Sequence, residues 1–135
     1  MTVKRKMEEI SYNNPLKVNQ TDKTPLLCYD PKNRLFTMSG VSVPENARIF
    51  YEPIMKWVEG YVRSEHSKDG ITINVHLDYF NIASSAILLK ILKEFEKIGD
   101  RVIINWFYDE EDDDMKEIGD DLQWMVKVQF NVIKK

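Results

Sequence analysis

Apolar residues recur at two different spacings along the chain, and the change of spacing predicts where helices and strands lie. Between residues 49 and 62 the spacings alternate between one and three, which predicts a helix with one broad apolar face. Between residues 71 and 79 apolar and polar residues alternate, which predicts a strand with one buried face. A second helix is expected after Asn81, ending at Gly99. Residues 102–108 are almost all apolar and predict a central strand covered on both faces.

Shorter patterns predict the elements that come first in the domain. Residues 25–29 and 35–39 are short strand candidates on either side of a turn, and together they resemble a hairpin. Ser42 and Glu45 match a capping box, in which the hydroxyl and the carboxylate satisfy free N–H groups at a helix start. The first helix is therefore expected to begin at this box.

The last elements complete a single α/β domain. Asp109 is expected to cap a third helix that Gly119 interrupts, and residues 127–133 alternate as a last strand. Strands and helices that alternate in this way predict a mixed sheet of four or five strands with about three helices packed against it. Residues 1–24 are polar and without periodicity, so we expect a flexible N-terminal leader followed by one domain over residues 25–135.

The charged residues are distributed unevenly, with acidic residues concentrated in one segment. The chain has a net charge of −3, but nine carboxylates and a single lysine lie between Asp109 and Asp121. The remaining basic residues are spread out without interleaved aromatic residues, so we expect no nucleic-acid partner. No apolar stretch is long enough to cross a membrane, and the single cysteine, Cys28, suits a reducing cytoplasm. We therefore expect a cytoplasmic protein with no membrane partner.

Several large side chains fall at helix or strand spacing. Such residues are found in the core more often than at an interface, so we expect them to be buried. They are Met38, Phe50, Met55, Trp57, Trp106 and Trp124.

The start of the second helix is the first candidate for chemistry. A strand ends there and a helix begins at Asn81, so free N–H groups and the helix dipole favour an anion, including a phosphate on a nearby hydroxyl. Small polar residues are also what an ordinary helix start contains. The residues alone therefore leave both interpretations open.

The acidic run is the second candidate for chemistry. The alternative function is a small metal-dependent enzyme or cation-binding domain that would use residues 109–114. Consecutive acids point in different directions on a helix, and no glycine stands where a calcium loop requires one, so we expect no metal. His66 and His76 lie near no serine elbow, and no glycine-rich loop could hold a nucleotide cofactor. We therefore expect neither catalysis nor a cofactor.

Four segments resemble the SiaC-type bacterial regulatory phosphoproteins. They occur in order and with similar spacing within residues 25–133, and they are Ser39–Asn46, Tyr79–Ser85, Asn105–Glu110 and Glu117–Asp121. The resemblance implies a STAS-like fold, the fold of anti-sigma-factor antagonists, and a protein that is not an enzyme. It implies a partner-switching module whose unphosphorylated form binds a target protein. In the best-known branch that target is a diguanylate cyclase.

The resemblance also implies how the switch is controlled. A protein kinase phosphorylates a hydroxyl at the start of the second helix, and a PP2C-like phosphatase removes the phosphate. The added charge of about −1.5 to −2 would break the interface by repulsion and desolvation. The family acceptor is a threonine directly after the asparagine, where this chain has Ile82. An isoleucine cannot accept a phosphate.

Three explanations of Ile82 remain open at this stage. The acceptor has moved to Ser84 or Ser85, the switch has been lost and the target is bound constitutively, or the residue at this position is an inactivating change. The serine pair resembles the pair at the same helix start of anti-sigma-factor antagonists, which favours the first. The expected partner-binding surface comprises His76, Asp78, Asn81, Ile82, Ser84 and Ser85. The acids of the third helix are expected at its rim.

Overall fold

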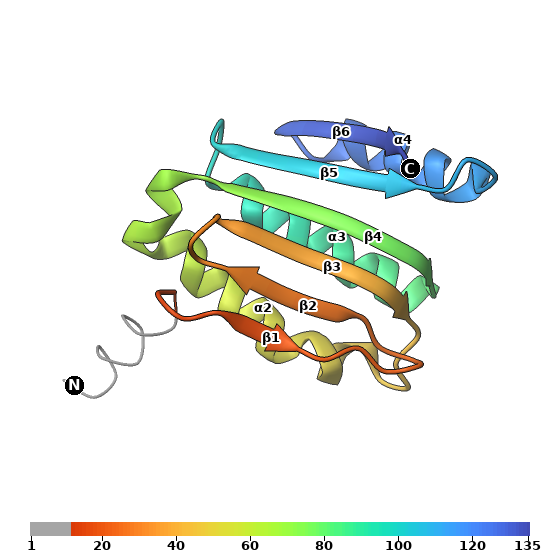
Figure 1. Ribbon diagram of the computed structural model, residues 1–135, viewed down its shortest axis with the longest axis horizontal. Coiled ribbons are helices and arrows are strands. Elements are labelled where there is room, and N and C mark those ends of the chain that lie inside the picture. The colour runs from red at the N-terminus through yellow and green to blue at the C-terminus, as the bar shows by residue number, and fades with distance from the viewer. Residues whose placement is uncertain (1–11) are drawn as a thin grey trace.

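A computed structural model describes residues 12–135, which form six strands and three α-helices (Figure 1). The strands are β1 (Leu16–Val18), β2 (Leu26–Asp30), β3 (Leu35–Ser42), β4 (Ile71–Phe80), β5 (Val102–Tyr108) and β6 (Gln129–Lys134). The helices are α2 (Ala47–Arg63), α3 (Ile82–Glu96) and α4 (Asp113–Met125), with a short 3₁₀ helix, η1 (Glu65–Asp69). The predicted alternation of helix and strand is confirmed. The prediction of four or five strands is wrong, because the sheet has six.

The sheet follows the order of the chain, from β1 at one edge to β6 at the other. The first two pairs of neighbours are antiparallel, which confirms the β2–β3 hairpin, and the other three pairs are parallel. The additional strand is β1, in which Leu16 lies opposite Tyr29 of β2. The sheet thus begins within the segment expected as a leader, whose residues 1–11 lie outside the described part of the chain.

All three α-helices cover the same face of the sheet (Figure 1). Each crossover between parallel strands is right-handed by strong preference, and the three crossovers step across the sheet in one direction, so the helices accumulate on one side. The prediction that residues 102–108 are covered on both faces is therefore wrong. Ile103, Asn105 and Phe107 lie on the uncovered face, where Asn105 is hydrogen-bonded to Asn74 and Asn131 of the neighbouring strands (2.9 Å each).

Two of the three predicted helix starts are corrected by the side chains that cap them. Asn46 accepts from the backbone N–H of residue 49 (3.1 Å) and caps α2, so the predicted capping box at residues 42–45 does not form. Asp112 caps α4 in place of Asp109. The third prediction is confirmed, because Asn81 caps α3 and accepts from the backbone N–H of Ser84 (2.9 Å).

Trp106 and Gly119 form the contact that sets α4 against the sheet. Trp106 is fully buried and its Nε1 donates to the carbonyl of Met115 (2.9 Å). A Cβ atom on Gly119 would lie 2.4 Å from Cδ1 of this ring. Gly119 therefore does not interrupt the helix as predicted, since α4 continues to Met125. It allows the helix backbone to approach the indole.

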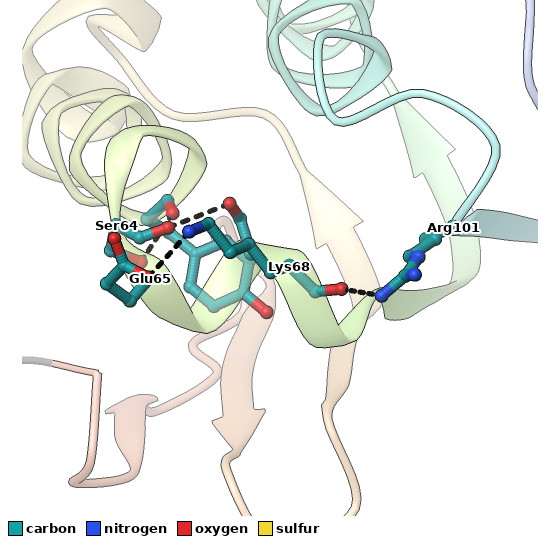
Figure 2. A network of polar contacts seen from close by, with 6 residues as sticks. Ser64, Glu65, Lys68 and Arg101 are labelled. Carbon is teal, nitrogen blue, oxygen red and sulfur yellow. Dashed lines mark hydrogen bonds and ion pairs between the residues drawn. The ribbon is translucent and has the colours of Figure 1, made fainter.

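The opposite end of the sheet from the α3 start is closed by a polar network around η1 (Figure 2). Ser64 donates through its hydroxyl to the carbonyl of Tyr61 (2.7 Å), and Lys68 pairs with Glu65 (2.8 Å). Arg101, in the connection before β5, donates to the carbonyl of Lys68. These bonds tie the end of α2 to the amino ends of β4 and β5.

Glu96 holds the last turn of α3 to the segment that follows α4. Its carboxylate accepts from the backbone N–H of Lys127 and from Nζ of Lys93 (3.1 Å). The N–H of Lys127 is the main cause that lowers the pKa of Glu96, with the bond to Lys93 second. The carboxylate is therefore stabilised in its charged form in the folded state.

The Trp106 contact predicts that Gly119→Ala destabilises the protein by about 1–3 kcal/mol, because the added methyl group must displace the buried ring or the helix. Urea denaturation measures the loss. Lys116→Ala on the same helix is the control, since it changes only an exposed side chain paired with Asp120. A Gly119→Ala protein as stable as the wild type would contradict the close approach.

Glu96→Gln is expected to lower the free energy of unfolding by about 1 kcal/mol at neutral pH, because two charge-assisted hydrogen bonds are weakened. A carboxylate with a lowered pKa stabilises the fold above its ordinary pKa, and this contribution is lost as the pH falls through its pKa in the folded state. The difference between wild type and variant should thus be constant above about pH 5 and shrink in acid. Thermal melts across this range measure it, and a difference independent of pH would contradict the assignment.

Candidate functional site

The carboxyl ends of β3 and β4 meet the amino end of α3, and this junction is the candidate site. The backbone N–H of Asn81 donates to the carbonyl of Ser42 (3.1 Å), so the turn into α3 is attached to the end of β3. Beyond it, Ile82 is 89% exposed and Tyr79 is also exposed. Two of the exposed large apolar residues of the described chain thus lie at this junction, which presents an uncovered apolar surface.

The two candidate serines lie in opposite environments. Ser84 is 1% exposed, and its hydroxyl accepts from Oγ of Ser42 (2.9 Å). Oγ of Ser42 also lies 2.6 Å from the hydroxyl of Tyr51. Since Ser42 donates its one proton to Ser84, Tyr51 is the donor in the second bond. Burial raises the pKa of the Tyr51 phenol, and the bond to Ser42 offsets part of that rise.

Ser85 is half-buried and reaches the surface. Its hydroxyl donates to the carbonyl of Ile82 (2.7 Å), the common local bond of a serine in a first helical turn. No part of the described chain covers this hydroxyl as Ser42 covers that of Ser84. Of the two serines, only Ser85 is placed where an enzyme could reach its Oγ without opening the core.

The structure separates His76 from the other predicted site residues. His76 lies on the uncovered face of the sheet and stacks on Phe107, with ring centroids 4.0 Å apart. Burial is the main cause that lowers its pKa, and the charge of Lys135 adds to this. Asp78 is exposed near the end of β4. The site thus brings together Asn81, Ile82 and Ser85, whereas His76 faces away from α3.

A groove of about 370 Å³ runs from this junction between α3 and α4. The predictions from sequence included Asn81, Ile82 and Ser85 and placed the acids of the third helix at the rim, but they did not include the apolar residues that α4 contributes. Trp124, next to the groove residue Met125, was predicted to be in the core, but it is 78% exposed. The groove is lined by Phe80, Asn81, Ile82, Ser85, Ala86, Leu89, Ile118, Asp121, Leu122 and Met125.

A signal for the missed residues was present in the sequence. The stripe of α4 that packs on the sheet uses Met115, Gly119 and Leu122, and its spacing of four and three leads next to the buried Val126. Trp124 lies two residues from both Leu122 and Val126, which places it on the opposite side of the helix. Its exposure therefore follows from the spacing of the stripe.

The acidic run does not converge on a point. Asp112 caps α4, Glu110 pairs with Lys134 (3.5 Å), and Asp109 with Lys135 (4.0 Å). Within residues 12–135, no three carboxylate, imidazole or thiol groups are close enough together to hold a metal ion. In the same range no helix has the length and apolarity that a bilayer crossing requires. The metal-site alternative therefore has no geometric support in this part of the chain.

The sequence of residues 18–135 matches the family model of the SiaC family regulatory phosphoproteins. The chain belongs to the SiaC family. This confirms the resemblance seen in the four sequence segments. Members of the family are regulatory phosphoproteins, so this SiaC-family protein is a regulator in signal transduction and not an enzyme.

Solved SiaC structures share the fold. A chain in the crystal structure of the diguanylate cyclase SiaD in complex with its activator SiaC from Pseudomonas aeruginosa has a TM-score of 0.80 at 23% identity, covering 89% of this chain and 99% of that chain. SiaC of Pseudomonas aeruginosa has a TM-score of 0.78 at 22% identity, covering 90% and 99%. An uncharacterized protein of Pseudomonas aeruginosa strain UCBPP-PA14 is 24% identical over 111 residues, covering 80% of this chain and 86% of that protein.

The environments of the two serines predict opposite effects of the same substitution. Ser84→Asp is expected to cost about 3 kcal/mol or more, because it places a carboxylate in a buried site. Ser85→Asp is expected to leave stability nearly unchanged, since the carboxylate reaches water near a helix amino end. Chemical denaturation of both variants measures the difference, and equal stabilities would contradict the burial of Ser84.

Proposed function

We propose that this SiaC-family protein binds a diguanylate cyclase through the α3 start when it is unmodified, and that phosphorylation of Ser85 releases the cyclase. A protein kinase adds the phosphate and a PP2C-like phosphatase removes it, in the cytoplasm. The cyclase is proposed because the SiaC of Pseudomonas aeruginosa was crystallised in complex with the diguanylate cyclase SiaD, of which it is the activator. Kinase and phosphatase are proposed from the regulatory phosphoprotein family.

The exposed side chain of Ile82 is the observation that carries the proposal. An isoleucine that is 89% exposed stabilises nothing within the described chain, but it gains the full hydrophobic contribution when a partner covers it. The groove behind Ile82 extends this surface with Ala86 and Leu89. An apolar patch of this kind, bordered by polar residues, is typical of a protein interface.

Ser85 is placed to control that interface. Its hydroxyl lies in the wall of the groove, three residues after Ile82, so a phosphate there would occupy the volume that a partner must fill. The phosphate adds about −1.5 to −2 charges next to apolar contacts, and docking would require its desolvation. Ser84 is not proposed as the acceptor, because its hydroxyl points into the core and is bonded to Ser42.

The proposal also explains why an isoleucine, Ile82, stands at the family acceptor position. In this chain the residue contributes apolar contact area, and the acceptor lies one helical turn later at Ser85. Contact with the partner and acceptance of the phosphate are thus assigned to two different residues of this chain. This division keeps a phosphate switch without a hydroxyl at residue 82.

Binding of the purified protein to each diguanylate cyclase of its own organism tests the proposal. Ser85→Asp is expected to weaken the interaction by about tenfold or more, because it places a charge in the interface, whereas Ser85→Ala should bind like the wild type. Calorimetry and the rate of cyclic di-GMP synthesis measure the two effects.

Tandem mass spectrometry of the peptide from Asn81 to Lys90, isolated from cells in which the kinase is active, gives the second readout. Phosphate on Ser85 supports the proposal. Phosphate only on other residues, or equal binding by Ser85→Asp and Ser85→Ala, would overturn the switch. Binding without any phosphate in the cell would identify a constitutive binding protein instead.

A further inference from the structure

Asp121 is the charged residue in the lining of the groove, and further carboxylates lie next to it on the exposed side of α4. Asp114, Ile118, Asp121 and Met125 succeed one another at spacings of four and three, so they form one stripe along the helix, and Glu117 lies beside it. Within residues 12–135, none of the carboxylates of Asp114, Glu117 and Asp121 forms an ion pair. The lysine of this helix, Lys116, instead pairs with Asp120 (2.9 Å).

Apolar side chains make up most of the lining of the groove. Ile82 and Met125 are both exposed lining residues, and the exposed Trp124 precedes Met125. Lys93 of α3 connects the two helices next to Met125, because its Nζ donates to the carbonyl of that residue (3.1 Å). The lining of the groove is thus mostly apolar, with Asp121 in it and the carboxylates of Asp114 and Glu117 beside it on α4.

The second groove of the helix layer, between α2 and α3, differs in charge. It has a volume of about 280 Å³, and both signs alternate along its walls. Its charged lining residues are Arg48, Glu52, Lys56, Glu59 and Lys90. A positively charged partner is therefore attracted to the groove between α3 and α4, whereas the mixed charges of the groove between α2 and α3 favour neither sign.

We propose that the α3–α4 groove binds a partner segment whose apolar residues are flanked by lysines or arginines. This rests on the proposed function and names the chemistry of the segment that the partner presents. The apolar residues of the segment cover Ile82, Leu89 and Met125, and its cations lie opposite the carboxylates of α4. The three carboxylates attract such a segment at long range and disfavour an acidic one.

Selection from a phage-displayed library of random peptides of about 16 residues, with the full chain as bait, tests this chemistry for a partner of any identity. We expect the selected peptides to combine two or more large apolar residues with several lysines or arginines. Their affinity, measured with synthetic peptides, should fall as salt is raised, because the attraction is screened. Selection of acidic or uncharged peptides, or of none, would overturn the proposal.

Matched variants locate the binding. Removing the three charges with Asp114→Asn, Glu117→Gln and Asp121→Asn should weaken peptide binding by about tenfold and flatten its salt dependence. Glu52→Gln, Glu59→Gln and Glu65→Gln change the net charge equally but lie elsewhere, so they should bind like the wild type. In the same way Met125→Ala should weaken binding and Ile49→Ala on α2 should not.

Equal affinities of the two charge-removal variants would overturn the groove assignment. The same variants separate this proposal from the proposed function. If a cyclase binds the wild type and both charge-removal variants alike, the chemistry of the groove is wrong and the cyclase function stands. If no cyclase binds while the peptides still depend on the α4 carboxylates, the groove stands and the cyclase function is wrong.

Discussion

The hydrogen bond from Ser42 to Ser84 is the interaction on which the site depends. It joins the end of β3 to the first turn of α3, and the second bond, from Tyr51, adds α2 to the same buried point. With Ser84 held inward, the helical period of 3.6 residues turns Ile82 and Ser85 outward. Three elements distant in the sequence thereby determine which side chains of one short turn reach solvent.

The second constraint is the placement of all helices on one face of the sheet. Helices on one face leave grooves between neighbours, and the two grooves here lie on either side of α3. The contact between Gly119 and Trp106 brings α4 close to the sheet, which sets the depth of the α3–α4 groove. The helix that follows β5 thereby supplies one wall of the candidate binding surface, with Asp121 in its lining.

Local patterns predicted most of the fold, because hydrophobic period and capping residues act over a few neighbours. The strand at residues 71–79, the cap at Asn81 and the β2–β3 hairpin were all confirmed. Predictions failed where two local signals competed for one helix start, or where a strand forms only by pairing with another segment. Asn46 caps α2 in place of the predicted capping box, because the hydroxyl of Ser42 is used in a buried network. Strand β1 was missed because it forms by pairing with β2, and the pattern of its own three residues does not predict that pairing.

The sequence by itself determined the order of elements, the apolar stripes and the absence of a hydroxyl at residue 82, since these depend on residue identity and near neighbours. Only the tertiary structure decided that Ser84 is buried and Ser85 accessible, although the two serines are adjacent and chemically identical. It also decided that Trp124 is exposed beside a groove. Exposure depends on what packs against a side chain, and here those groups come from β3, α2 and α4, tens of residues away in the chain.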